Sequence, residues 1–495
     1  MPLHLYRSNR TEELVKRLVT NITAAPPADV FAEIPIAVGS RGMERWLRNQ
    51  IATHRGIATR LAFPFPRPAF DGAVIALLNQ QLPALPFWAR EQTDSSWSSE
   101  ATPWRVVPAI RALLAQPDAA TQAAMAPVRN YLKPDPTASR TRPVSARELS
   151  FAQEVASALD DVLRQRPDVA ATWRESAAEL PAAQRWLALT LRQVDQQAAV
   201  GEDAATLRER LRRRRQLAGE DLGALHVFGL SSLHAEELKT LTVVAQSDRL
   251  QVHLYLLAPS CEWHQDFRSK DERRRALRQS LAEDAVNGGD SASRLLIEFE
   301  DYNTLLADCG RPSRDVQTLL TAATGVVESD HGQGDRDGAP GLFVDPLLRK
   351  PWLDEAGDRA AQKGHVSALA GLQHDILFAT AGPAPEHRTT LPDNDRSVQL
   401  HPCHGPLRQV EVLRDQLLYA FAQDPTLQPR DVLVMTPDIG TYAPLVAAVF
   451  AHAPEGATRS DWNGKPVSKL PAIPVSISDL GLRSTNAVAD VLLTV

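Results

Sequence analysis

The turn after the first apolar segment of this chain constrains both its fold and its chemistry. Residues 3–7 alternate apolar and polar side chains as a short strand does, and a helical apolar stripe follows. The run Ile34-Pro-Ile-Ala-Val38 again leads through a turn into a helix, so the pattern predicts a parallel α/β sheet. Where a nucleotide-binding sheet carries a glycine-rich phosphate loop, this chain has Ser8-Asn9-Arg10. Asn9, with Glu12 three residues on, is expected to cap the first helix.

Length and composition limit the remaining possibilities. A chain of 495 residues is too long for one compact core, so we expect two or three domains. The formal net charge of −6 is weak for this length, and any nucleic-acid surface must therefore be a local patch. The three cysteines form neither a disulfide framework nor a zinc pattern, and no segment reads as a signal peptide or membrane span. We expect a cytoplasmic protein.

Apolar patterning predicts five segments. In chain order they are the first part of an α/β domain (1–84), a mainly helical insertion (85–220), a return to the same sheet (221–327), a linker (328–397) and the start of a second, incomplete α/β domain (398–495). Later strands are expected at 225–230, 250–257, 398–401, 431–435 and 473–477. The prolines of residues 63–68 predict an extended path, and the glycine-rich residues 328–341 predict a disordered loop.

No catalytic motif accompanies this layout. The chain lacks G-x-x-x-x-G-K-[ST], so it has no backbone cradle for phosphates, and we expect no ATP hydrolysis of its own. Its carboxylates are scattered and do not form a metal-nuclease site. His401, Cys403 and His404 could be taken for metal ligands, but Pro402 lies among them and no second cluster exists, which favours packing at a strand end. We therefore expect no catalytic site, cofactor or metal in this chain.

Two arginine clusters are candidates for nucleic-acid contact. Arg41, Arg45 and Arg48 lie four and three residues apart on the second expected helix, so they share one side and can meet successive phosphates. The apolar side of that helix consists of Met43, Trp46, Leu47 and Ile51. The second cluster consists of Arg208, Arg210 and Arg212–Arg215. Spacing alone favours a solvated basic face for both clusters, and the two alternatives stay open.

A series of more specific motifs runs in order along nearly the whole chain. It consists of Tyr6-Arg-Ser-Asn-Arg10, Gly42-Met-Glu-Arg-Trp-Leu47, Gly56-Ile-Ala with Phe63-Pro-Phe-Pro66, Arg166-Pro-Asp-Val with Trp173, Val227-Phe-Gly-Leu-Ser-Ser-Leu233 and Asp345-Pro-Leu-Leu348. The motifs are strongest in residues 401–413, 424–435 and 474–479. Together they resemble the RecC family, the gamma chains of exodeoxyribonuclease V.

This resemblance implies a helicase-like fold of the superfamily 1 type that has lost its ATP site and serves as a scaffold. In that family the gamma chain joins a RecB-like beta chain, a helicase and nuclease, and a RecD-like alpha chain, a second helicase. The complex unwinds and degrades double-stranded DNA ends, and ATP and Mg²⁺ are used by the partner subunits. The gamma chain splits the strands and scans one of them for the Chi sequence. The implied process is double-strand break repair by homologous recombination.

Two departures from the family pattern bear on this expectation. Family chains are much longer, so we expect a fragment, a truncated gene product or a split subunit. Arg41 and Arg45 stand where relatives carry uncharged side chains, and Asp71 stands where an aromatic residue is expected. Asp160 and Arg166 match the family's recognition set. The predicted DNA-binding residues are Arg41, Arg45, Arg48, Asp160 and Arg166, and the DNA word that the chain reads is left open.

Two other classes of function fit the same sequence. One is a self-contained module that binds single-stranded DNA, and the other is a protein scaffold, in one form a non-functional truncated chain, that makes no DNA contact. Salt-dependent DNA binding by the isolated chain would separate these classes.

Overall fold

The computed structural model describes most of the chain between residues 3 and 478. Outside this description lie residues 1–2, 28, 30, 79–85, 90–101, 134–142, 176–179, 198–203, 214–220, 231–232, 248, 288–302, 324–325, 329–340, 348–366, 382–390, 392–393, 451–472 and 479–495. The chain divides into two compact units, which are described separately. The first comprises Met1–Gly39, Leu47–Arg359 and Leu372–Arg388, and the second comprises Ser40–Trp46, Ala360–Gly371 and Thr389–Val495.

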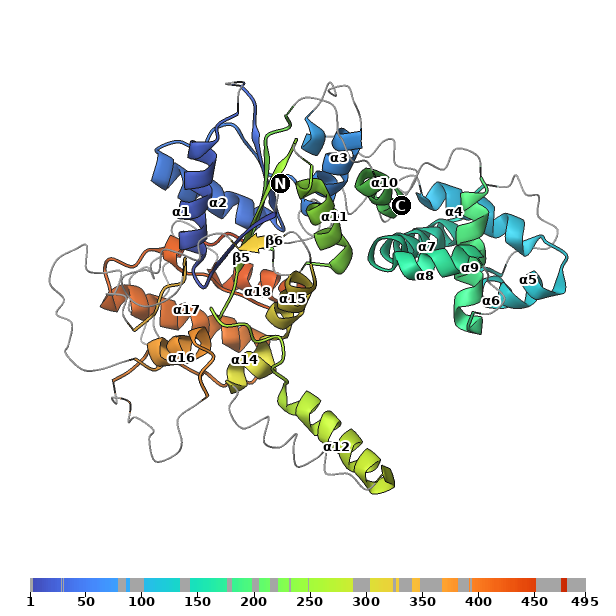
Figure 1. Ribbon diagram of the computed structural model, residues 1–495. Coiled ribbons are helices and arrows are strands. Elements are labelled where there is room, and N and C mark those ends of the chain that lie inside the picture. Colours follow the sequence, from blue (N-terminus) through green and yellow to red (C-terminus); the bar gives the residue numbers. More distant parts are fainter. Residues whose placement is uncertain are drawn as a thin grey trace, which may run out of the picture. The chain divides into compact units, whose positions relative to one another are not determined.

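The described part of the first unit contains a six-stranded sheet in the order β3-β2-β4-β5-β1-β6, and every pairing is parallel (Figure 1). The strands are β1 (Leu3–Ser8), β2 (Ile34–Val38), β3 (Leu61–Ala62), β4 (Ala224–Phe228), β5 (Gln251–Leu257) and β6 (Val326–Glu328). The sheet resumes after the helical segment, because β4 pairs with β2 and β5 pairs with β1. The α/β fold expected from the sequence is therefore confirmed.

Two of the strands were not expected from the sequence. β3 and β6 have two and three residues, which is too short to show a hydrophobic period. β6 pairs with β1 and includes Glu328, the first residue of the loop expected to be disordered. Residues 329–340 of that predicted loop lie outside the described residues.

One face of the sheet is aliphatic. Because side chains alternate along a strand, Leu225, Val227 and Leu254 lie on the same face, and all three are fully buried. They belong to one apolar cluster with residues of α3 (Pro66–Leu78) and α11 (Ala235–Ala245). A parallel sheet covered by helices requires this continuous apolar burial.

The opposite face carries stacked aromatic rings across three neighbouring strands. His4 and His226 both stack on His253, with ring centroids 5.1 and 5.0 Å apart. Tyr6 stacks on Tyr255 at 4.9 Å. Burial, with a smaller contribution from a neighbouring histidine, lowers the pKa of His226 to about 3 and that of His253 to about 4. Both imidazoles are therefore neutral at neutral pH.

Helix α1 (Thr11–Ala24) covers this aromatic face. Asn21 Nδ2 donates to Tyr255 Oη at 2.7 Å, and the Arg17 guanidinium lies 5.2 Å from the centroid of the Tyr6 ring. Figure 1 shows α1 and α2 (Arg41–Arg55) on one side of the sheet and α3 and α11 on the other. The sheet is therefore covered by helices on both faces.

The start of α3 corrects one expectation. The extended path predicted for residues 63–68 is wrong in its second half, because α3 begins at Pro66. Pro66 and Pro68 lie in the first turn, where backbone N–H groups have no intrahelical acceptor, so neither proline removes a helical hydrogen bond. Further along α3, a Cβ at Gly72 would lie 2.1 Å from the carbonyl oxygen of Phe87, in the short 3₁₀ helix η1 (Phe87–Ala89). This close approach requires glycine.

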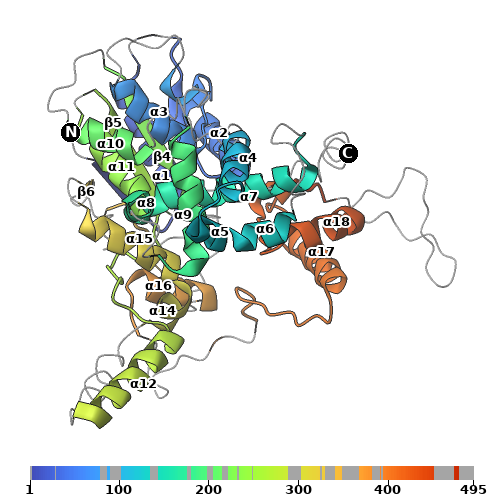
Figure 2. The same ribbon diagram turned by 90° about the vertical axis from the view of Figure 1, so that its right-hand side faces the viewer.

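The helical insertion has an apolar core of its own. Its helices are α4 (Thr102–Leu114), α5 (Ala119–Ala124), α6 (Ala126–Leu132), α7 (Ala146–Gln165), α8 (Pro167–Glu175), α9 (Ala182–Asp195) and α10 (Ala204–Arg213). Ile110, Leu159 and Leu191 from α4, α7 and α9 are buried in one cluster, and Figure 2 shows these three helices together. A capping box of Ser145 and Glu148 starts α7.

The helices after β5 are α12 (Lys270–Asn287), α14 (Thr304–Cys309), α15 (Arg311–Ala322) and α16 (Ala368–Leu377). A small apolar cluster joins Ala258 and Cys261, which follow β5, to Phe343 and Leu377. No helix in the described part of the chain is long and apolar enough to cross a membrane.

The second unit is built around α17 (Pro406–Gln423) and α18 (Ile439–Phe450), preceded by the short η4 (Pro429–Asp431). Val410, Phe450 and Ile473 form its buried cluster. The described residues show no strand at 398–401, 431–435 or 473–477, where the sequence predicts one. Leu433 and Met435 are more than four-fifths exposed. An apolar run becomes a strand only beside a pairing partner, and local pattern does not supply one.

Candidate nucleic-acid interface

The turn between β1 and α1 is closed by a distant part of the same chain. Ser8 Oγ donates to the carbonyl of Leu342 at 2.7 Å, and Asn9 Nδ2 donates to the carbonyl of Val344 at 2.8 Å. The Val344 N–H donates back to Asn9 Oδ1 at 2.9 Å. The capping role expected for Asn9 is therefore wrong: Arg10 is the N-cap residue, and the Asn9 side chain holds Val344 instead.

The same turn differs from a phosphate loop in the groups that it presents. In a phosphate loop, backbone N–H groups point at the anion. Here the Arg10 N–H donates to Ser8 Oγ at 3.0 Å, and the carbonyl oxygens of Leu342 and Val344 lie against the side chains of the turn. Carbonyl oxygens repel phosphate oxygens, so this arrangement disfavours a bound nucleotide at the turn.

Arg7, at the end of β1, is used inside the protein. Its Nη2 donates to the Cys261 carbonyl at 2.9 Å, and its guanidinium lies 4.5 Å from the centroid of the Trp263 ring. The same guanidinium lies 5.5 Å from the centroid of the Phe343 ring. Burial raises the pKa of the Cys261 thiol to about 11, so this cysteine is not a reactive nucleophile.

Helix α2 presents the three arginines that the sequence singles out. Ser40 Oγ accepts from the Met43 N–H at 3.2 Å in the first turn, and Leu47 and Ile51 are fully buried. Arg41, Arg45 and Arg48 are all exposed. The structure therefore agrees with the predicted division of α2 into an apolar and a basic side.

Each of these arginines makes a weak contact within the protein. Arg41 pairs with Glu44 one turn along at 2.6 Å. Arg45 Nη1 donates to Ser476 Oγ at 2.5 Å, and both residues belong to the second unit. The Arg48 guanidinium lies 4.7 Å from the centroid of the Phe63 ring. Contacts of exposed arginines are of small energy, so a phosphate group can replace them.

Asp160 is held in a network of ion pairs between α7 and α3. It accepts from Arg67 at 2.7 Å and from Arg164 at 3.0 Å, and Arg164 also pairs with Asp71 at 3.0 Å. Burial acts to lower the pKa of Arg164, but the neighbouring carboxylates of Asp71 and Asp160 outweigh it and raise that pKa, so the Arg164 guanidinium is charged. Asp160 is thus partnered by two cations within the protein. Sequence reasoning missed Arg67 and Arg164, although the i, i+4 spacing of Asp160 and Arg164 was a signal.

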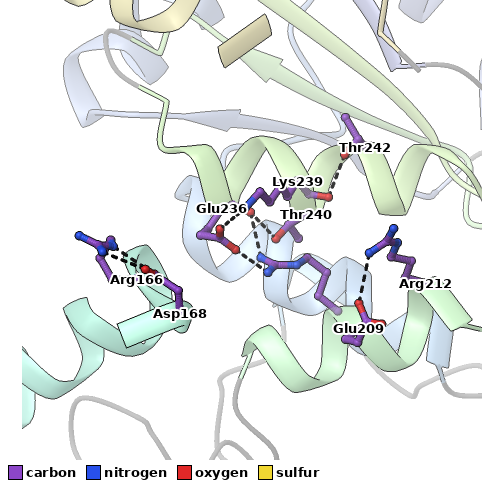
Figure 3. Close-up of polar contacts among 9 residues, drawn as sticks. Arg166, Asp168, Glu209, Arg212, Glu236, Lys239, Thr240 and Thr242 are labelled. Atoms are coloured by element: carbon purple, nitrogen blue, oxygen red, sulfur yellow. Dashed lines mark hydrogen bonds and ion pairs between the residues drawn. The ribbon is translucent and has the colours of Figure 1, made fainter. Parts of the chain in front are cut away.

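Arg166 lies just after α7 and is exposed. Figure 3 shows its side chain paired with Asp168 through two hydrogen bonds, at 3.0 and 2.8 Å. The hydrogen bond from Arg166 lowers the pKa of Asp168 to about 2, so the Asp168 carboxylate is charged at neutral pH and the two side chains form an ion pair. A ligand that binds Arg166 must compete with this carboxylate.

The second arginine cluster divides into two parts. Arg208 is mostly buried and pairs with Glu236 of α11, so the solvated face expected for it is wrong. Arg212 and Arg213 are exposed and pair with Glu209 on the same helix. Figure 3 shows the pair of Arg212 and Glu209. Residues 214–215 lie outside the described residues. In the described, exposed part of this cluster, Arg212 and Arg213 share one acidic neighbour, Glu209.

A parallel sheet covered by helices on both faces, with its first turn closed by the chain's own backbone, defines a protein of the doubly wound α/β class. The chain belongs to the RecC family: the family described as RecC, N-terminal domain, matches residues 3–379. The resemblance that the sequence motifs indicate is therefore confirmed.

Three relatives illustrate the extent of this similarity. The RecBCD enzyme subunit RecC of Mycobacterium tuberculosis (strain H37Rv) is 31% identical over 515 residues, which cover all of this chain and 39% of that protein. The RecC subunit of Mycolicibacterium smegmatis is 30% identical over 91% of this chain, and that of Escherichia coli K12 is 27% identical over 91%. The chain spans about two fifths of the length of the curated relatives that it matches.

Proposed function

We propose that this chain acts in DNA repair as the DNA-binding, non-catalytic part of a RecBCD-type complex. Family membership over residues 3–379 and the name of the relatives, RecBCD enzyme subunit RecC, support this assignment. The partners in the proposal are a RecB-like beta chain, a RecD-like alpha chain and DNA. We place the complex in the cytoplasm, in keeping with the free state of Cys261, Cys309 and Cys403.

The observation that carries the non-catalytic role is the closed turn between β1 and α1. Asn9 exchanges two hydrogen bonds with Val344 at the position where a phosphate loop would bind its ligand. ATP and Mg²⁺ are therefore assigned in this proposal to the partner subunits, which supply the helicase and nuclease activities. The purified chain should not hydrolyse ATP, with or without DNA. DNA-stimulated hydrolysis that disappears when Ser8, Asn9 and Arg10 are substituted would contradict this role.

DNA contact is assigned to α2, where three exposed guanidinium groups lie on one side of a helix. In the proposal the chain helps to separate the strands and scans one of them for a Chi-like word. Arg166 is exposed and can reach a base edge or a phosphate, whereas Asp160 acts through its ion pairs with Arg67 and Arg164. In the proposal, few polar side chains are thus available to recognise a particular DNA sequence.

Salt-dependent binding of single-stranded DNA tests the role of α2. Each phosphate contact contributes about 0.7 to the slope of log K against log salt, so Arg41→Ala, Arg45→Ala and Arg48→Ala together should lower the slope by about 2. Binding should weaken equally for all sequences. The matched control removes the same charge at Arg212, Arg213 and Arg311, which lie on two other helices, α10 and α15. Loss of binding in the control with none in the α2 variant would refute the assignment.

A further inference from the structure

Helix α12 (Lys270–Asn287) is strongly basic in its first half. The basic residues there are Lys270, Arg273, Arg274, Arg275 and Arg278, and the acidic ones are Asp271 and Glu272. The chain as a whole has a formal charge of −6. Residues 270–278 are thus a local positive patch on an acidic protein, which is the distribution that nucleic-acid binding needs.

The base of α12 is fixed by a capping box. The Ser269 N–H donates to Glu272 Oε2 at 2.8 Å, and the Glu272 N–H donates to Ser269 Oγ at 3.2 Å. The hydrogen bond from the Ser269 backbone is the largest cause that lowers the pKa of Glu272, to about 2. The carboxylate at this cap is therefore charged at neutral pH.

Two further contacts attach this base to neighbouring helices. Arg314 of α15 donates to the Glu272 carboxylate at 3.1 Å, and the Arg314 side chain is almost fully buried. The Lys270 N–H donates to Asp308 Oδ1 of α14 at 2.7 Å. The start of α12 is thus held in a defined direction.

Beyond its base, α12 is exposed along the side that carries the arginines. Figures 1 and 2 both show the helix extending from α14, with its far end away from the other labelled helices of the first unit. Arg274, Arg275 and Arg278 are exposed. The carboxylate near Arg274 belongs to Asp271, at 3.8 Å, and both side chains are more than half exposed, so this ion pair is weak.

The composition of α12 indicates what it can bind. Its apolar residues do not gather on one face, and Leu281 is more than half exposed, so the helix lacks the stripe that packs against protein. It contains no aromatic residue on which a base could stack. Arg274 and Arg278 lie about 6 Å apart along the helix axis. A guanidinium group can bind two oxygens of one phosphate group at the same time.

We propose that α12 binds the sugar–phosphate backbone of DNA through Arg274, Arg275 and Arg278, without regard to base sequence. This contact rests on the proposed DNA-binding function and adds to it a surface made of residues other than the arginines of α2. Because its base is anchored by Glu272 and Arg314, the helix holds the backbone of these three residues in a defined direction.

The experiment measures binding of the full chain to a fluorescent single strand and to the matching duplex over a range of salt concentrations. Arg274→Gln, Arg275→Gln and Arg278→Gln together should lower the salt slope by about 2 for the single strand and by nearly 3 for the duplex, if each arginine meets one phosphate. The charge-preserving set Arg274→Lys, Arg275→Lys and Arg278→Lys should retain most of the slope. The control Arg212→Gln, Arg213→Gln and Arg311→Gln removes the same charge and should leave the slope unchanged. Circular dichroism establishes that each variant is folded.

The possible outcomes separate the DNA-binding role of α12 from that of α2. An unchanged slope in the α12 glutamine variant, or an equal loss in the control, overturns the role of α12. If the α2 variant loses binding while the α12 variant does not, the proposed function stands and this inference fails. If the reverse holds, α12 is supported and the assignment to α2 fails. A wild-type chain with no salt-dependent DNA binding would overturn both.

Discussion

The two faces of the parallel sheet share one backbone but are stabilised by different chemistry. On one face, Leu225, Val227 and Leu254 pack with α3 and α11 in a cluster whose described members are all apolar. On the other, His226 and His253 stack beneath α1 and are kept neutral by burial. The aliphatic face needs only close packing, whereas the aromatic face also needs every buried polar atom to find a partner. Acid should therefore act on the aromatic face and leave the aliphatic face unaffected.

At neutral pH the largest effect is expected on the aliphatic face. Leu241 of α11 is fully buried in the aliphatic cluster, so Leu241→Ala should lower the free energy of unfolding by about 2–5 kcal/mol through lost burial and the cavity left behind. The loss should be the same at neutral and mildly acidic pH, since no ionisable group belongs to that cluster. Urea titrations at several pH values measure it. A loss that grows on acidification would break the distinction between the faces.

The aromatic face should make the protein sensitive to acid. The pKa values of His226 and His253, about 3 and about 4, lie below the ordinary value of 6.5, so between about pH 4 and 6.5 the unfolded chain binds protons that the folded chain does not. Stability is therefore complete above pH 6.5 and falls as the pH drops, by about 1.4 kcal/mol per pH unit for each histidine. His226→Phe with His253→Phe keeps stacked rings and should flatten this dependence. A double variant with the wild-type pH profile would show that other groups cause it.

A smaller effect is expected from the hydrogen bonds of the aromatic face. Tyr255 Oη accepts from Asn21 at 2.7 Å and lies 3.2 Å from His226 Nδ1. Tyr255→Phe should lower the free energy of unfolding by about 1–3 kcal/mol, because the Asn21 amide loses its partner while the ring stays in place. The double variant Tyr255→Phe with Asn21→Ala should then cost less than the sum of the single changes. Additive losses would mean that the two groups are not coupled in solution.

Local pattern was enough to predict the long elements of the sheet and the basic side of α2. Strands β1, β2, β4 and β5 are apolar runs of five to seven residues, long enough for their period to show. The exposure of Arg41, Arg45 and Arg48 follows from helical spacing once Leu47 and Ile51 are buried. The missing phosphate loop is likewise a property of the sequence itself, and the ordered motifs were sufficient to indicate the RecC family.

Contacts between residues far apart in the chain were decided only by the tertiary structure. Asn9 pairs with Val344, 335 residues away, and Asp160 pairs with Arg67, 93 residues away, so neither partner could be found from local periodicity. The same reason explains why the apolar run at 432–435 is no strand among the described residues: a strand is a property of two segments. The sequence by itself determined the long strands at the centre of the sheet and the amphipathic helices beside them. The tertiary structure decided what they pair with, because hydrogen bonds and ion pairs between distant residues form only when the whole chain brings their atoms together.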